Sequence, residues 1–194
     1  MLYYLSLLTQ MEELAFFRLF RYLTFRSGAA VVTALLFAFL INPMLIRWLK
    51  VKQGKGQPIR ADGPARHIIE KAGTPTMGGL LILSALFFST LLWARLDIGF
   101  IWLILFVTLS FGLIGFWDDY AKVSKQNTKG APGKVRFGLG LAIAALAGFW
   151  ASYLHPADLT NQLALPVFKD VLINLGILFV PFAMIVIVGA ANAV

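Results

Sequence analysis

The sequence predicts an all-α, polytopic integral membrane protein. Hydrophobic residues make up 59% of the 194 residues, and charged residues make up only 13%. A soluble domain of this length would carry about twice that charged fraction. The apolar residues gather in stretches close to the ~20 residues that a helix needs to cross a bilayer. Together, these two observations exclude an ordinary soluble globular protein.

Five apolar stretches predict five transmembrane helices, which we treat as one membrane domain over residues 1–194. The stretch 1–26 is also apolar, but it contains Glu12, Glu13 and three arginines. This mixture predicts an amphipathic interfacial helix rather than a sixth span. No basic region precedes its apolar run, so it does not resemble a secretory signal. The five predicted spans are Ser27–Ile46, Thr76–Ala94, Phe100–Trp117, Phe137–Leu154 and Val171–Val188.

The basic residues predict the orientation of the chain in the membrane. Residues 47–73 and 118–136 together hold 12 of the 17 lysines and arginines. Because cytoplasmic loops carry an excess of Lys and Arg, both segments are predicted to be cytoplasmic loops, with the N-terminus periplasmic. The arginines within residues 1–26 stand against this orientation. The net charge of +8 is therefore read as a topology signal, and no nucleic acid partner is expected.

An acidic pair follows the third predicted span. Phe100–Trp117 is 18 residues without a charge, and Asp118 and Asp119 follow it directly. Carboxylates are costly at membrane depth and mark functional sites by default. Two adjacent acids ionise together only with help from a metal, a lysine or a shared proton. The alternative is an ordinary polar stop after a span. Adjacent helical residues point about 100° apart, so the two acids need not share a role. Three lysines follow them: Lys122, Lys125 and Lys129.

A glycine-rich segment, residues 63–79, precedes the second predicted span. Its glycines permit close backbone approach, and Lys71 and Thr76 supply a charge and a hydroxyl suited to phosphate. Backbone N–H groups at the start of the following helix would also favour an anion. The alternative is a helix start with Pro75 at an early position. His67 lies between basic neighbours, which favours anion binding over metal binding, although a solvated loop histidine is the plainer interpretation.

With this orientation, the glycine-rich segment, the acidic pair and Asn192 converge on the cytoplasmic face. In order, they are Gly73-Thr74-Pro75-Thr76-Met77-Gly78-Gly79, Phe116-Trp117-Asp118-Asp119-Tyr120 and Gly189-Ala190-Ala191-Asn192-Ala193-Val194. In this order and spacing the chain resembles the phospho-N-acetylmuramoyl-pentapeptide-transferase family, within the polyprenyl-phosphate N-acetylhexosamine-1-phosphate transferases. The Thr-Pro-Thr-Met-Gly-Gly string is typical of the muramoyl branch. Thr128-Lys129-Gly130 also resembles the family.

The resemblance implies transfer of a phospho-sugar from UDP-N-acetylmuramoyl-pentapeptide to undecaprenyl phosphate, with Mg²⁺ as cofactor, at the bacterial inner membrane. It implies catalytic roles for Asp118 and Asp119. Asp118 would deprotonate or orient the lipid phosphate, and Asp119 would support the metal. The remaining metal ligands, and the nucleophile of a two-step mechanism, would lie outside this sequence. A homodimer is also implied. The substrate-binding residues would be Lys71, Thr76, Asn192, His67 and Lys129.

Family members have about ten spans, so the chain resembles their N-terminal half. The family's Asn-Leu-Thr-Asp-Gly run after Asn192 is absent from this sequence. We therefore expect the 194-residue chain alone to be inactive, and read-through of the gene past Val194 would show whether that run follows. Three alternatives remain. A sister transferase would use another UDP-sugar, and half of a transporter would carry its acids near the midplane of a span. A non-catalytic membrane scaffold is the third.

Overall fold

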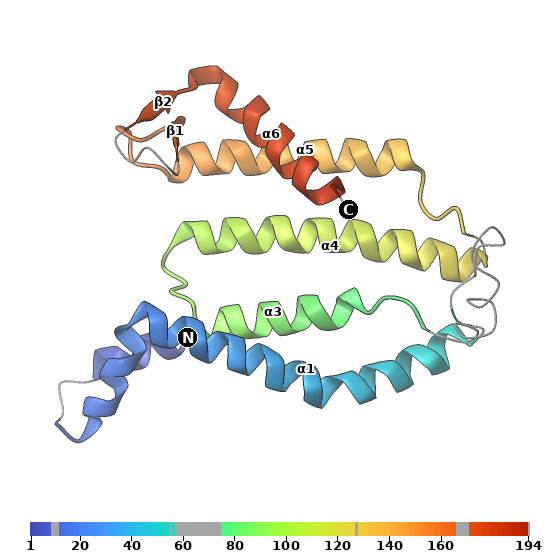
Figure 1. The fold of residues 1–194 in the computed structure, drawn as a ribbon, viewed down its shortest axis with the longest axis horizontal. Helices are drawn as coiled ribbons and strands as arrows, with labels where there is room; N and C mark the ends of the chain where they lie inside the picture. Colours follow the sequence, from blue (N-terminus) through green and yellow to red (C-terminus); the bar gives the residue numbers. More distant parts are fainter. Residues whose placement is uncertain (9–11, 55, 57–74, 127, 166–170, 194) are drawn as a thin grey trace. The chain divides into compact units, whose positions relative to one another are not determined.

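The computed structural model describes residues 1–8, 12–54, 56, 75–126, 128–165 and 171–193. Helices dominate these residues, which confirms the predicted all-α class (Figure 1). The chain divides into two units. Unit 1 comprises Met1–Ile101 and Gly115–Ala131, and unit 2 comprises Trp102–Ile114 and Pro132–Val194. The long helix α4 (Gly99–Lys125) therefore contributes its two ends to unit 1 and its middle to unit 2.

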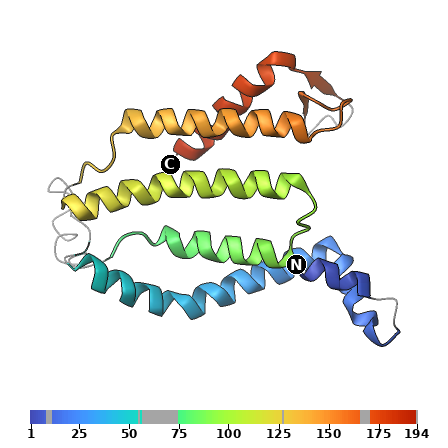
Figure 2. The ribbon, with the colours of Figure 1, turned by 180° about the vertical axis from the view of Figure 1, so that it is seen from behind.

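Unit 1 is built on the helices α1 (Leu23–Gln53) and α3 (Gly79–Trp93). The two helices lie side by side and run in opposite directions, as Figures 1 and 2 both show. The indole N–H of Trp93 donates a hydrogen bond of 2.9 Å to the hydroxyl of Thr33, and the rings of Phe37 and Phe88 stack with centroids 5.0 Å apart. Polar and aromatic contacts therefore join α1 and α3 near one end and along their length.

The surface of α1 is that of a lipid-facing helix. Large apolar side chains point outward along it, and Leu36 and Phe39 are 57% and 75% exposed. Such exposure would be costly in water but is ordinary in hydrocarbon. Pro43 lies inside the helix, where it cannot donate a backbone hydrogen bond, and α1 bends in Figure 1. Among the described residues, three helices are long and apolar enough to span a membrane, namely α1, α4 and α5.

Unit 2 packs the helix α5 (Gly133–Leu154) against the helix α6 (Phe179–Asn192). Small residues permit the contact: Ala144 is fully buried, and a Cβ at Gly148 would lie 3.4 Å from Val180 and Ala183. This is the small-residue packing typical of membrane helices. In the sequence, α5 and α6 are connected through an antiparallel pair of strands, β1 (Gln162–Ala164) and β2 (Leu172–Asn174), in which Leu163 pairs with Ile173. The short 3₁₀ helix η3 (Gly176–Leu178) leads into α6.

The fifth predicted span, Val171–Val188, is wrong at its start. Residues 172–174 form a strand, and α6 begins only at Phe179. Apolar periodicity alone does not separate a short buried strand from the start of a helix. Here residues 172–174 pair with β1, and Gly176, with a φ of +50°, separates this strand from α6. The 14 residues of α6 extend about 21 Å, less than the ~30 Å of a hydrocarbon core.

The other boundaries also need correction. α4 continues to Lys125, eight residues past the predicted span Phe100–Trp117, so the acidic pair lies on the helix. α1 likewise continues to Gln53, past the predicted end of its span at Ile46. α3 begins at Gly79 rather than Thr76. The interfacial segment contains two 3₁₀ helices, η1 (Leu2–Leu8) and η2 (Glu12–Arg21), in place of one amphipathic α-helix.

Candidate functional site

Asp118 is the most enclosed charged group of the candidate site. It lies in the last two turns of α4, and its side chain is 9% exposed. The ammonium nitrogen of Lys122, one turn further along the helix, lies 2.6 Å from its Oδ2. The backbone N–H of Ala131 donates a hydrogen bond of 2.8 Å to its Oδ1. A buried carboxylate needs partners of this kind, because an uncompensated charge in such a place is strongly destabilising.

Gly130 permits the backbone after α4 to approach this carboxylate. Its φ is +63°, a conformation that side chains with a Cβ rarely adopt. A Cβ added there would collide with Oδ1 of Asp118 and would lie 2.9 Å from Cε of Lys122. The helix ends at Lys125, and Gln126, the capping residue that follows, has a left-handed conformation. The glycine therefore allows residues 130–131 to fold back against Asp118.

Asp119 is held by a different pair of contacts. Its Oδ1 lies 3.3 Å from the ammonium nitrogen of Lys122, and its Oδ2 accepts a hydrogen bond of 3.2 Å from the hydroxyl of Thr76. Its side chain is 32% exposed, in contrast to that of Asp118. The structure thus brings Thr76 and Asp119, two residues predicted as site residues, into direct contact across 43 positions of sequence. It also shows that Lys122 contacts both acids, which sequence reasoning left open.

Gln53 fixes the backbone of Thr76. Its side-chain amide donates to the carbonyl of Thr76 at 3.1 Å and accepts from the N–H of Thr76 at 2.9 Å. The Gln53 residue is 8% exposed, so the pair of hydrogen bonds is shielded from solvent. Met77, the next residue, has a φ of +72°, which turns the chain into α3. Three elements therefore meet in unit 1: the end of α1, the segment before α3 and the end of α4.

Sequence reasoning missed Gln53. The signal was a polar residue at the end of a long apolar helix, immediately before the glycine-rich segment. That pattern is common at helix ends, and nothing local distinguishes a buried Gln53 from an exposed one. The contact of the Gly130–Ala131 backbone with Asp118 was missed for the same reason, because a hydrogen bond across 13 positions leaves no periodic pattern.

Four further residues are predicted to bind substrate, and the structure describes two of them. Lys71 and His67 lie outside the described residues. Lys129 is exposed in the segment that follows α4. Asn192 ends α6 in unit 2, where its side-chain amide donates to the carbonyl of Val188 at 2.8 Å.

The two carboxylates can be tested as a magnesium site by their donor chemistry. Within the described part of the chain, no group of three or more His, Cys, Asp or Glu side chains is arranged to hold a metal. Mg²⁺, however, is commonly held by one or two carboxylates together with substrate phosphates. Asp119, with a third of its side chain exposed, fits that mode better than Asp118. The donor set thus fits a metal shared with a phosphorylated ligand.

Comparisons with known proteins match two segments of the chain. Residues 71–83 match phospho-N-acetylmuramoyl-pentapeptide-transferase signature 1, and residues 101–194 match glycosyl transferase family 4. Thr76 lies in the first match, and Asp118 and Asp119 lie in the second.

Curated relatives match over the whole chain. Two proteins named phospho-N-acetylmuramoyl-pentapeptide-transferase, from Ruegeria sp. (strain TM1040) and Ruegeria pomeroyi, are each 65% identical over all 194 residues. One of the same name from Dinoroseobacter shibae is 59% identical over the same length. The chain spans 53% of the length of each of these relatives.

Proposed function

The chain belongs to the phospho-N-acetylmuramoyl-pentapeptide-transferase family, and we propose that the protein transfers phospho-N-acetylmuramoyl-pentapeptide from its UDP derivative to undecaprenyl phosphate. In this reaction an oxygen of the lipid phosphate attacks the phosphorus attached to the sugar. The bond from that phosphorus to the bridging oxygen breaks, UMP leaves, and lipid I is formed. The observation that carries the proposal is the Thr76–Asp119–Lys122–Asp118 cluster at the end of a 27-residue membrane helix.

The cluster suits phosphoryl transfer because that chemistry needs positioning and charge stabilisation more than covalent help. We assign to Asp118 the acceptance of a proton from the lipid phosphate or the orientation of that phosphate. Asp119 and the hydroxyl of Thr76 would line the position of the diphosphate. Lys122, which contacts both acids, would hold them in position in the absence of substrate. Lys71, His67, Lys129 and Asn192 are proposed as further substrate contacts, on the resemblance alone.

Magnesium is proposed as the cofactor, with Asp119 as the residue that would hold it. When bound, the ion would neutralise negative charge on the diphosphate. Three further proposals concern orientation, location and oligomeric state. The Lys- and Arg-rich segments would face the cytoplasm, and the protein would reside in the bacterial inner membrane as a homodimer. Because the chain spans 53% of its relatives, we also propose that the 194 residues alone do not catalyse transfer.

The test is an assay of UMP release by the full-length protein in lipid nanodiscs, with both substrates supplied. We expect Asp118→Asn to lower kcat by a factor of about 10²–10⁴, the usual contribution of a general acid or base. Asp158→Asn, at an exposed position in unit 2, is the matched control and should retain full activity. Full activity of Asp118→Asn would refute the assigned role. Release of UMP by the purified 194-residue chain would refute the proposal that the chain alone is inactive.

Two alternatives are disfavoured by specific observations. A transporter would place its acids near the middle of a span, whereas Asp118 is the twentieth residue of the 27 in α4. A sister transferase with another UDP-sugar is disfavoured by the match of residues 71–83 to the muramoyl signature. Transfer from a UDP-N-acetylglucosamine donor, and not from the muramoyl donor, would reverse that choice.

A further inference from the structure

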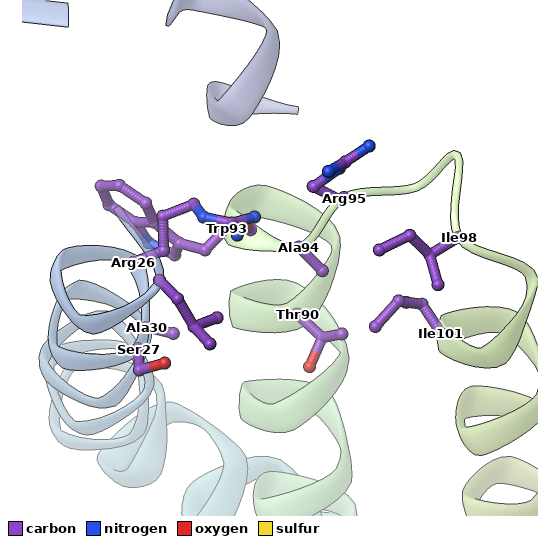
Figure 3. Close-up of a pocket in the computed structure, with 10 residues that line it drawn as sticks. Arg26, Ser27, Ala30, Thr90, Trp93, Ala94, Arg95, Ile98 and Ile101 are labelled. Carbon is purple, nitrogen blue, oxygen red and sulfur yellow. The ribbon is translucent and has the colours of Figure 1, made fainter. Parts of the chain in front are cut away.

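A second site candidate lies at the opposite end of unit 1. A cavity of about 250 Å³ opens between the first turns of α1, the last turn of α3 and the start of α4 (Figure 3). Arg26 and Gln53 are 27 positions apart on α1, or roughly 40 Å along the helix. A small ligand in this cavity therefore does not reach Asp118 or Asp119, and the cavity is separate from the proposed transferase site. Its lining combines two arginines with hydroxyl and apolar side chains: Arg26, Arg95, Ser27, Thr90, Ile98 and Ile101.

Arg26 carries hydrogen-bonding capacity that the described residues do not use. Its Nη1 donates a long hydrogen bond of 3.4 Å to the carbonyl of Trp93, and its guanidinium lies over the ring of Tyr3 at 5.0 Å. Its Nε, however, is buried and has no hydrogen-bond partner among the described residues. A buried N–H of a charged group without an acceptor is costly, and each such case calls for an explanation. A bound oxygen ligand would be one.

Arg95 places a second cation at the same aromatic ring. Its guanidinium lies 4.8 Å from the ring of Tyr3, on which Arg26 also packs. Asp97 binds Arg95 at 2.6 Å, and this hydrogen bond lowers the pKa of the Asp97 carboxyl. Among the side chains that the structure describes, no carboxylate pairs with Arg26, and Asp97 pairs with Arg95 alone. Two arginines beside one carboxylate favour an anionic ligand.

The start of α1 adds to this preference for an anion. The N-terminal end of a helix is positive, and its first N–H groups need acceptors. Tyr22, the residue before α1, gives no side-chain hydrogen bond to them. A cation in the first turn, such as Arg26, is unfavourable beside this positive end unless an anion accompanies it. The helix end and the two arginines therefore favour the same kind of ligand.

The apolar part of the cavity indicates what the anion is attached to. In Figure 3 the side chains of Ile98 and Ile101 face the cavity from the side opposite α1, and the hydroxyls of Ser27 and Thr90 lie deeper than the guanidinium of Arg26. Trp93 also lines the cavity. Tryptophan side chains are enriched at membrane–water interfaces, where lipid headgroups lie. A cavity with a basic rim and an apolar wall, at the end of membrane-spanning helices, suits a phosphate group that carries acyl chains.

We propose that this cavity binds an anionic membrane phospholipid, with the phosphate between Arg26 and Arg95 and an acyl chain along Ile98 and Ile101. Binding there accounts for Arg26, one of the N-terminal arginines that contradict the positive-inside pattern, because the lipid supplies its counter-charge. The lipid would also join α1, α3 and α4 at the end where Arg26, Trp93 and Arg95 meet. This proposal depends on the membrane location of the helices and not on transferase activity, so either proposal can fail alone.

The test is native mass spectrometry of the full-length protein in detergent, titrated with phosphatidylglycerol or with phosphatidylcholine. We expect phosphatidylglycerol to bind more tightly. Arg26→Gln and Arg95→Gln should each weaken its binding about fivefold, the effect of one basic residue near an anionic lipid. Arg21→Gln is the matched control, because it removes the same charge from an exposed position of η2 outside the cavity, and it should bind as the unmodified protein does.

A second variant, which keeps both arginines, tests the cavity even if the arginine variants misfold. Ala30→Leu narrows the cavity, which Ala30 lines, and keeps both arginines, and it should also reduce phosphatidylglycerol binding. Equal binding of the two lipids, or equal loss in Arg21→Gln, would overturn the proposal. Glycerol phosphate is the soluble probe of the same headgroup chemistry. Competition by glycerol phosphate at the concentration of the lipid would overturn the acyl-chain part and identify a free-anion site.

Discussion

Substitution of Gly130 by alanine is the sharpest test of how the structure holds Asp118. At a φ of +63°, an L-residue with a Cβ costs about 1–2 kcal/mol. The new Cβ would also overlap Oδ1 of Asp118, so either the carboxylate or residues 130–131 must move. Movement breaks the hydrogen bond from the Ala131 N–H to Oδ1, and a hydrogen bond to a charged group contributes about 1.5–3 kcal/mol.

These terms give an expected loss of activity. If only the hydrogen-bonded arrangement is competent, a penalty of 1.5–3 kcal/mol lowers kcat by a factor of roughly 10–150. The KM for the UDP donor should change little, because Asp118 is assigned to the lipid phosphate. The assay is UMP release by the full-length protein, together with its melting temperature. Gly115→Ala is the control, since Gly115 lies on α4, the helix that carries Asp118, with nothing within 4 Å of an added Cβ.

Gly130→Asn separates the two causes. Asparagine tolerates the left-handed conformation better than alanine but carries the same Cβ. If the collision with Asp118 dominates, both variants lose activity to a similar extent. If the backbone conformation dominates, the asparagine variant recovers most of it. Activity of Gly130→Ala equal to that of Gly115→Ala would refute the argument that the Gly130–Ala131 backbone positions Asp118.

Three further predictions concern other contacts. Gln53→Leu should lower activity about tenfold or more, because it removes two shielded hydrogen bonds to Thr76. The activity of Gln53→Glu, which keeps only the acceptor, should lie between those of Gln53→Leu and the unmodified protein. Unchanged kinetics in Gln53→Leu would contradict this prediction. Gly148→Leu should destabilise the α5–α6 contact by about 1–3 kcal/mol and lower the melting temperature, whereas Gly138→Leu, with nothing within 4 Å of an added Cβ, should not. Asp119→Asn should reduce activity and its magnesium dependence. The melting temperature should change little, because the Asp119 side chain is 32% exposed. A fall in melting temperature as large as that of Asp118→Asn would contradict the different exposure of the two acids.

The sequence predicted the helical class and most of the helices because apolar runs of span length are a strong signal. α4 and α5 appear where Phe100–Trp117 and Phe137–Leu154 were expected, with extensions at their polar ends. The extensions were missed because a charged residue ends a hydrophobic run without ending a helix. The strand at 172–174 was missed because its partner lies ten residues earlier, and pairing with that partner outweighs local apolar character.

For the site, three of the side chains predicted from the sequence lie together in unit 1. Thr76, Asp118 and Asp119 stand out by residue type and by position beside apolar spans. The groups that hold them did not stand out. Gln53 contacts Thr76 across 23 positions, and the Ala131 backbone contacts Asp118 across 13. Such contacts depend on how α1 and the segment after α4 are placed, which no local pattern encodes.

The unequal exposure of the two acids suggests how adjacent carboxylates acquire different roles. Asp118 is 9% exposed, and Lys122 and the Ala131 N–H bind its two oxygens. We expect a substrate phosphate to reach Asp118 only if one of these contacts loosens, for example when the phosphate draws Lys122 away. Asp119 is exposed enough to meet a ligand while Thr76 still orients it. Lys122, which touches both acids, is therefore the residue through which a phosphate at Asp119 would alter the contacts of Asp118.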